Sequence, residues 1–185
     1  HVNVGTANAI NNLTNLARDN TPLLLMAGRT PITESGAFGS RNRHIHWAQE
    51  MFDQAGMVRE IVKWDYEFRA PGRIDTVINR AVEMTMTHPR GPIYLALPRE
   101  PLSAPADDAA LAPARAIAAP PAPDAAAIEE LAVLFTAASN PLIITGAGGR
   151  EVEGFAAISS FAERWAVPVV TVNPRFLSLP TSHPM

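Results

Sequence analysis

Residues 21–28 read Thr-Pro-Leu-Leu-Leu-Met-Ala-Gly, and residues 91–98 read Gly-Pro-Ile-Tyr-Leu-Ala-Leu-Pro. Each stretch is a short, continuously apolar run that is bounded by glycine or proline. Such runs are typical of strands that are buried on both faces of a parallel sheet. We therefore predict buried parallel strands over residues 22–28 and 92–97.

Helical patterns lie beside these strands. Residues 5–18 place apolar side chains at helical spacing, and a second apolar stripe begins at Ile74 and is ended by Pro89. A long polar excursion, residues 29–47, follows the first strand. Helices that alternate with buried strands predict an α/β fold with a parallel sheet.

The same pattern recurs near the end of the sequence. Asp124 is a suitable N-cap for a helix, and residues 141–145 form an apolar strand that leads through a glycine turn into a helix ending near Trp165. Residues 168–172 follow as the next strand and complete a βαβ unit. We predict an α/β fold class: parallel-sheet βαβ units in two incomplete three-layer domains joined by a Pro/Ala-rich linker.

A segment rich in proline and alanine separates the two halves. Prolines number 17 in 185 residues, about 9% against a usual level of about 5%. Seven of them lie between Pro98 and Pro123, and because proline fixes φ and removes a donor, we expect extended polypeptide there. A long loop within one domain is the alternative. The predicted domains are residues 1–102 and 124–185, joined by a linker over residues 103–123.

Composition narrows the classes of function. Hydrophobic residues make up 47% and charged residues 18%, and the net charge is −3 with a pI near 5.9. The chain therefore has enough apolar material for a core and lacks the basic footprint of a nucleic-acid partner. No stretch approaches the roughly 18 apolar residues of a membrane span, so we expect no membrane partner. Zero cysteines exclude thiol catalysis and thiolate metal sites, and they fit a cytoplasmic location.

Two segments of the first half carry candidate binding chemistry. The segment from Gly5 to Asn8 opens a helix, where free N–H groups favour an anion or polar ring, although a simply capped helix start is the alternative. Residues 29–47 are rich in arginine, histidine and glycine and follow a strand, where ligands bind in open α/β sheets. An anion site and a solvated loop or subunit interface both remain open for this loop. A metal site would need a third ligand, and none is placed.

Two further segments each have both a structural and a chemical interpretation. Gln49 and Glu50 are expected to begin a short helix, in which Glu50 serves either as an acid or base or as a partner of the helix dipole. Residues 146–149 form a glycine-rich turn after a strand, but Glu151 stands where a dinucleotide fingerprint needs its third glycine. A tight turn between strand and helix is therefore favoured there.

Taken together, these segments resemble the thiamine-diphosphate-dependent enzymes of the acetolactate synthase and pyruvate oxidase type. Several stretches match in order over nearly the whole chain. Residues 5–19 match the family's G-x-x-N helix, Ala48-Gln49-Glu50 its F-Q-E segment, and Lys63 its lysine. Residues 91–98 match its G-P-V-x-x-x-x-P strand, and residues 140–184 match the start of its central domain. The resemblance implies the C-terminal part of a pyrimidine-binding domain followed by the N-terminal part of a central Rossmann-like domain.

The resemblance also implies a site and a chemistry. Gln49 would lie near the thiazolium and the substrate as the catalytic residue, and the cofactor-binding residues would be Asn8, Gly5, Val4 and His1, with no metal ligand. The implied cofactors are thiamine diphosphate and Mg²⁺, and the implied substrate is a 2-keto acid that is decarboxylated or ligated. The family builds its active site at a subunit interface, so a homodimer or tetramer is expected.

Departures from the family pattern limit these expectations. The catalytic glutamate of the family precedes the segment that matches His1, and its G-D-G…N motif for diphosphate and magnesium belongs to a third domain. Residues 175–177 read Arg-Phe-Leu where the family has G-K-G, which makes FAD or ADP doubtful. We expect a fragment of such an enzyme that is inactive alone. The alternative is a non-catalytic nucleotide-binding or assembly module of α/β fold.

Overall fold

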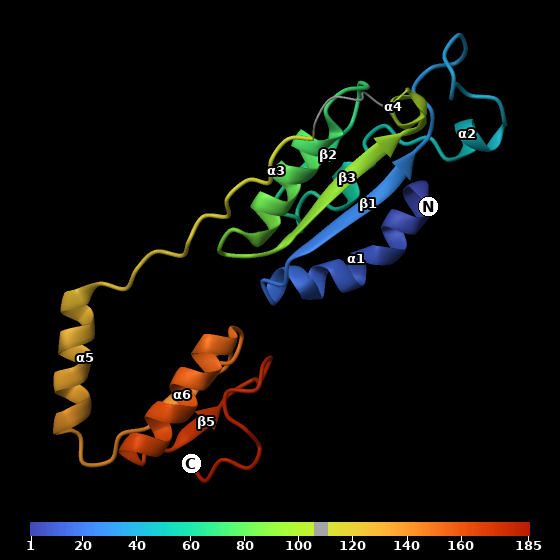
Figure 1. Cartoon of the computed structure of the whole chain (residues 1–185). Coiled ribbons are helices and arrows are strands. Elements are labelled where there is room, and N and C mark those ends of the chain that lie inside the picture. Colours follow the sequence, from blue (N-terminus) through green and yellow to red (C-terminus); the bar gives the residue numbers. More distant parts are fainter. Residues whose placement is uncertain (106–110) are drawn as a thin grey trace. The chain divides into compact units, whose positions relative to one another are not determined.

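The structure is a computed structural model that describes residues 1–105 and 111–185. The chain separates into two compact units, His1–Pro120 and Pro121–Met185 (Figure 1). Regular structure in the described residues stops at Ser103 and resumes at Ala125. Residues 106–110, which are part of the predicted linker, lie outside the described residues.

The first unit is built on a parallel sheet of order β1-β3-β2. Strand β1 covers Leu23–Arg29 and β3 covers Pro92–Pro98, and the two pair in register from Leu23 opposite Pro92 to Arg29 opposite Pro98. Strand β2, Asp65–Glu67, pairs with the other edge of β3. Both strands predicted in this half are confirmed, and β2 is an addition.

Two helices cover the faces of this sheet (Figure 1). Helix α1 covers Val2–Arg18 and packs Leu13 against Tyr94 and Ala96, while α3 covers Ile74–Met86 and packs Ala81 against Ile93 and Leu95. Alternate residues of β3 therefore serve opposite faces, as the twofold repeat of a strand requires. Both faces are apolar, which explains the unbroken apolar run in the sequence and confirms the parallel α/β fold.

Two short helices, α2 (Ile45–Ala48) and α4 (Arg99–Ser103), lie near the carboxyl ends of the strands. The 3₁₀ turn η1 (Ala55–Met57) packs into the core cluster that contains Tyr94. The predicted helix start at Gln49 is wrong, because Gln49 is the C-cap of α2 and its N–H donates to the Ile45 carbonyl at 3.0 Å. Phe52 is fully exposed, so it adds no buried apolar contact that would stabilise a helix starting at Gln49.

Part of the predicted linker is fastened to the first unit. The Asn79 side chain of α3 donates to the carbonyls of Ala112 and Pro113 at 3.2 and 3.0 Å. Arg115 pairs with Glu83 of the same helix at 3.0 Å. The segment after residue 110 is therefore extended, as expected for its prolines, and the first residues of this segment lie along α3.

The second unit holds helix α5 (Ala125–Ala137), strand β4 (Ile143–Thr145), helix α6 (Val152–Trp165) and strand β5 (Val169–Thr171). The two strands pair in parallel, which confirms the predicted βαβ unit. The Asp124 carboxylate accepts a hydrogen bond from the Ala126 N–H at 3.1 Å, which confirms the predicted N-cap. A Cβ on Gly149 would overlap the Leu177 carbonyl, so the glycine turn packs against its own chain.

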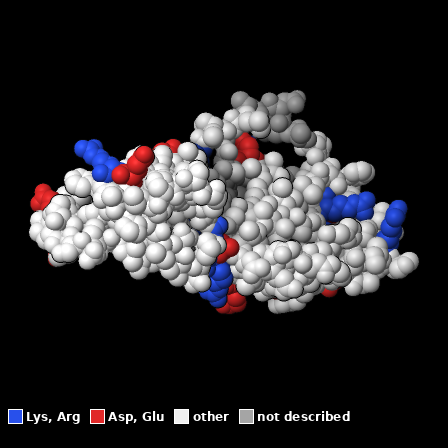
Figure 2. Space-filling model, turned by 90° about the horizontal axis from the view of Figure 1, so that it is seen from below, with Lys and Arg blue, Asp and Glu red and all other residues white. Residues whose placement is uncertain are grey.

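Two surface properties complete the description. Among residues 1–105 and 111–185, no helix combines the length and the apolar character that crossing a bilayer requires. The face drawn in Figure 2 carries its Lys, Arg, Asp and Glu side chains scattered among uncharged residues. No broad patch of one charge covers that face.

Candidate functional site

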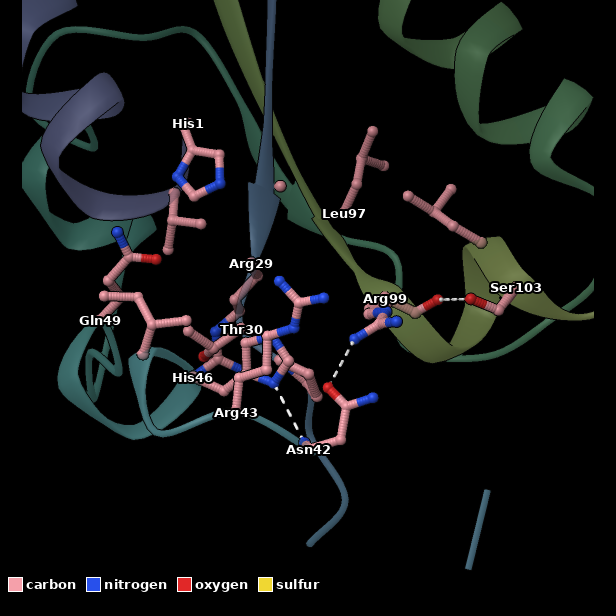
Figure 3. A pocket seen from close by; sticks show the side chains of 15 residues that line it. His1, Arg29, Thr30, Asn42, Arg43, His46, Gln49, Leu97, Arg99 and Ser103 are labelled. Carbon is pink, nitrogen blue, oxygen red and sulfur yellow. Dashed lines mark hydrogen bonds between the residues drawn. The ribbon is translucent and has the colours of Figure 1, made fainter. Parts of the chain in front are cut away.

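A cavity of about 600 Å³ lies where β1 and β3 end (Figure 3). Its wall combines the start of α1, the last residues of both strands, the segment from Asn42 to Gln49, and α4. The carboxyl edge of a parallel sheet is the usual ligand position in α/β folds, because loops and helix ends converge there. The first unit therefore contains a site of the kind its topology predicts.

A buried polar network fixes the start of α1 beside this cavity. Tyr94 of β3 is fully buried, and its hydroxyl receives a hydrogen bond from Gln54 Nε2 at 2.7 Å and lies 3.1 Å from Thr6 Oγ1. Thr6 Oγ1 in turn donates to the Val2 carbonyl at 2.7 Å, and Gln54 Nε2 also donates to the Gly28 carbonyl at 3.0 Å. These bonds join α1, β1 and β3 to the segment after α2, and so position the first residues of the chain.

The carboxylates of Glu50 and Glu100 hold the loop between β1 and α2, which borders the cavity. Glu50 accepts hydrogen bonds from Thr30 Oγ1 at 2.9 Å and from the guanidinium groups of Arg29 and Arg41. Glu100 accepts from both the N–H and the hydroxyl of Thr33, each at 2.7 Å. Burial alone would raise the pKa of Glu100, but the hydrogen bonds from Thr33, together with those from the Ile32 and Glu100 backbones, outweigh it and lower the pKa below its usual range.

The cavity wall is cationic. Three arginines and two histidines line it, and no aspartate or glutamate is present among its described lining residues. Arg29 is compensated by Glu67 at 3.2 Å and by Glu50 at 3.4 Å. In the part of the chain that the structure describes, the Arg43 guanidinium makes no ion pair or hydrogen bond, and that of Arg99 donates only to Asn42 Oδ1 at 3.4 Å.

The structure brings together two of the five predicted site residues. His1 and Gln49 both line the cavity and lie on the same side of it in Figure 3. Val4, Gly5 and Asn8 do not line it: they lie on α1, with the Val4 side chain 60% exposed and Asn8 exposed. Gly5 lies inside the first turn rather than before the helix, since its N–H donates to the His1 carbonyl at 2.9 Å.

Sequence reasoning did not single out Arg99 of the wall, and it gave no role to Lys63, which the family pattern includes. Yet a cation directly after a buried strand lies at the same sheet edge as the loop after β1. Lys63 lies outside the cavity. Its amino group donates to the Met84 and Thr87 carbonyls at 2.6 Å each, and burial lowers its pKa. Lys63 therefore ties the end of α3 to the start of β2.

The fold and this site define an α/β protein with a cavity at the carboxyl edge of a parallel sheet. No protein-family model matches the chain. The chain is 31% identical over 134 residues to sulfoacetaldehyde acetyltransferase of Rhodobacter capsulatus, covering 72% of this chain and 22% of that protein. It is 26% identical over 188 residues to benzoylformate decarboxylase of Pseudomonas aeruginosa, covering 99% of this chain and 34% of that protein.

Solved structures agree with these relatives. The chain superimposes along its whole length on 34% of a thiamin diphosphate-dependent enzyme from Mycobacterium smegmatis, with a TM-score of 0.77 and 27% identity. Benzoylformate decarboxylase from Polynucleobacter necessarius gives a TM-score of 0.74 at 26% identity. These relatives and solved structures confirm the resemblance of the chain to thiamine-diphosphate-dependent enzymes. It spans about a third or less of the length of these relatives.

Proposed function

We propose that this chain forms the pyrimidine-facing and substrate-facing wall of a thiamine-diphosphate-dependent enzyme that acts on 2-keto acids. The observation that carries the proposal is the cationic cavity at the ends of β1 and β3, where His1 and Gln49 lie together. Arginine and histidine suit a carboxylate substrate, because they offer charge-assisted hydrogen bonds. The benzoylformate decarboxylases among the relatives have a 2-keto acid in their name, which supports this substrate class.

The chain offers residues that suit one end of the cofactor. Val4 and Asn8 are exposed and one turn apart on α1, so an apolar side chain and an amide with donor and acceptor are presented together. This pair fits a polar aromatic ring such as an aminopyrimidine, with Gly5 between them adding no side chain. When bound, thiamine diphosphate supplies a nucleophilic carbon for the keto group. In the described residues no cluster of three or more acids or histidines suits Mg²⁺, so the diphosphate and its metal would need other groups.

The chain's own residues would act on the substrate. In the described part of the structure the Gln49 side chain makes no hydrogen bond, so its amide is available to hold a substrate oxygen. His1 lies beside it and would hold or move a proton at an imidazole nitrogen. Whether the product is an aldehyde or a ligated hydroxyketone depends on the second substrate.

The organisation of the whole enzyme is part of the proposal. We propose a pyrimidine-binding segment over residues 1–102, a linker over 103–123 and a central-domain segment over 124–185. The division of the chain between Pro120 and Pro121 falls inside that linker. We further propose a cytoplasmic homodimer or tetramer with its active site at a subunit interface, in which the 185 residues alone are inactive. A flavin or ADP is not proposed, since the Leu177 backbone lies against the glycine turn.

A titration tests the proposal on the complete enzyme that contains these residues. Thiamine diphosphate with Mg²⁺ should bind saturably, measured by calorimetry, and should support release of carbon dioxide from a 2-keto acid. An Asn8→Ala variant should weaken cofactor binding, whereas Asn12→Ala, on an exposed position one turn further along α1, is the matched control. Binding of ADP or NAD in preference to thiamine diphosphate would instead indicate the non-catalytic nucleotide-binding module.

A further inference from the structure

Within the described residues, two cations of the cavity wall have no acidic partner, and they approach from different elements. Arg43 lies in the loop before α2, and Arg99 is the first residue of α4, directly after β3. Arg29, the third arginine, is neutralised by Glu50 and Glu67. Two uncompensated guanidinium groups at one cavity raise its positive potential, which an anion would relieve.

Asn42 orients this end of the wall. Its side-chain oxygen accepts from Arg99 Nη1 at 3.4 Å, and its N–H donates to His46 Nδ1 at 3.3 Å. Because Nδ1 of His46 accepts, a neutral imidazole carries its proton on Nε2 and has a donor left for a ligand. Arg99 and His46 are therefore linked through one residue, and both expose donors rather than acceptors at the cavity.

Arg99 lies apart from the residues proposed for the chemistry. In Figure 3, His1 and Gln49 lie on one side of the cavity, Arg99 and Asn42 lie on the opposite side, and Arg43 lies between them. A substrate that reaches from Gln49 to Arg99 has its reacting group at one end and its distal group among cations. A neutral distal group would leave those guanidinium groups desolvated and unpaired, at a cost in binding free energy.

We infer, resting on the proposed function, that Arg43 and Arg99 form a distal anion subsite that selects 2-keto acids with a second, terminal carboxylate. The subsite is separate from the position where the keto group reacts. Arg43 and Arg99 are specificity-determining residues of this site, and Asn42 positions Arg99. The substrate class is thus a 2-keto dicarboxylate rather than a 2-keto monocarboxylate.

Kinetics with matched pairs of substrates on the complete enzyme test the inference. Each 2-keto dicarboxylate of four, five or six carbons is compared with the 2-keto monocarboxylate of equal length. We expect kcat/KM to favour the dicarboxylate by about tenfold or more for at least one length, because a hydrogen bond to a charged group contributes about 1.5–3 kcal/mol. A preference for the monocarboxylate at all three lengths would overturn the inference.

Variants separate the distal subsite from ordinary recognition of the carboxylate that all 2-keto acids share. Arg43→Met and Arg99→Met should each lower kcat/KM for the preferred dicarboxylate by about 10- to 100-fold and change the monocarboxylate less than about threefold. Arg115→Met, which removes an equally charged side chain outside the cavity, should change neither. Equal losses on both substrates would show that the arginines bind the shared carboxylate, and the inference would be wrong.

Binding of an unreactive diacid separates this inference from the proposed function. Glutarate should bind the complete enzyme more tightly than pentanoate in calorimetry, and the Arg43→Met/Arg99→Met double variant should lose that difference while keeping its thermal unfolding temperature. This readout needs no turnover, so it decides the inference even if no 2-keto acid reacts. Equal binding of glutarate and pentanoate would refute the subsite. Failure of thiamine diphosphate to bind would refute the proposed function alone.

Discussion

Replacing Tyr94 with phenylalanine removes one hydroxyl from the centre of the first unit and tests how the start of α1 is held. That hydroxyl lies within hydrogen-bonding distance of Gln54 Nε2 and Thr6 Oγ1, at 2.7 and 3.1 Å. The three residues are 0%, 2% and 1% exposed, in that order, so water cannot easily take over the lost bonds. The aromatic ring and its packing against Leu13 are kept in the variant.

The size of the effect follows from what each partner retains. Thr6 Oγ1 still donates to the Val2 carbonyl, and Gln54 Nε2 still donates to the Gly28 carbonyl, so neither side chain loses all its partners. One N–H of Gln54 is nevertheless left buried without an acceptor, which costs about 1–3 kcal/mol. We therefore expect Tyr94→Phe to destabilise the first unit by about 2 kcal/mol.

Hydrogen–deuterium exchange measures this change element by element. A loss of about 2 kcal/mol should make exchange about 30-fold faster in peptides that cover β3 and the start of α1, with α6 in the second unit unchanged. Tyr66→Phe is the matched control, because Tyr66 is 40% exposed and its hydroxyl makes no hydrogen bond in the described structure. A change below threefold for Tyr94→Phe, or equal changes in β3 and α6, would refute the reasoning.

Three further outcomes are expected. Gln49→Ala should reduce turnover of the complete enzyme by about tenfold or more with little change in unfolding temperature. Gln54→Ala, at a buried position, should instead lower stability by about 2 kcal/mol. If Gln49→Ala lost as much stability as Gln54→Ala, Gln49 would be merely structural. Glu100→Gln should destabilise the protein at pH 7, because the folded state lowers the pKa of Glu100. That difference should shrink as the pH falls from the usual value of 4.5 through the lower folded value, and a difference in thermal unfolding that is constant from pH 7 to 3 would contradict the assignment. The 185 residues alone, with thiamine diphosphate and Mg²⁺, should show no turnover of the 2-keto acid that the complete enzyme prefers in a carbon dioxide assay, and measurable turnover would contradict the proposed role of other segments.

The strands and long helices could be predicted because their patterns are continuous. The apolar run 92–97 is buried on both faces of the sheet, and the stripe from Ile74 covers one face of it. Strand β2 could not be predicted, because Asp65–Glu67 is a three-residue edge whose extended form depends on pairing with β3. Helix α4 was not predicted because it contains Pro101, and proline usually argues against a helix. Proline is tolerated in the first turn, where its missing N–H would have no helical partner.

The site was only partly predictable for a related reason. His1 and Gln49 came from the resemblance, and the cationic loop came from its position after a strand, but no pattern in the sequence joins Arg43 to Arg99. Their position on one cavity depends on the parallel pairing of β1 with β3, which brings two strand ends to one edge across more than 60 residues of sequence. A shared cavity wall of this kind is a property of the topology, and it becomes predictable only once the strand order is known.

The distribution of acids around the cavity explains why its charge persists in the folded protein. Glu50 and Glu100 lie beside the same loop, yet their carboxylates are taken up by Arg29, Arg41 and Thr33. These bonds anchor the loop at both ends, and an anchored carboxylate cannot also turn to neutralise Arg99. The same hydrogen bonds thus anchor the loop and keep the cavity cationic. A variant that removes the hydrogen-bond donors of Glu50 or Glu100, and so frees either carboxylate, should weaken both anion binding and the anchoring of the loop.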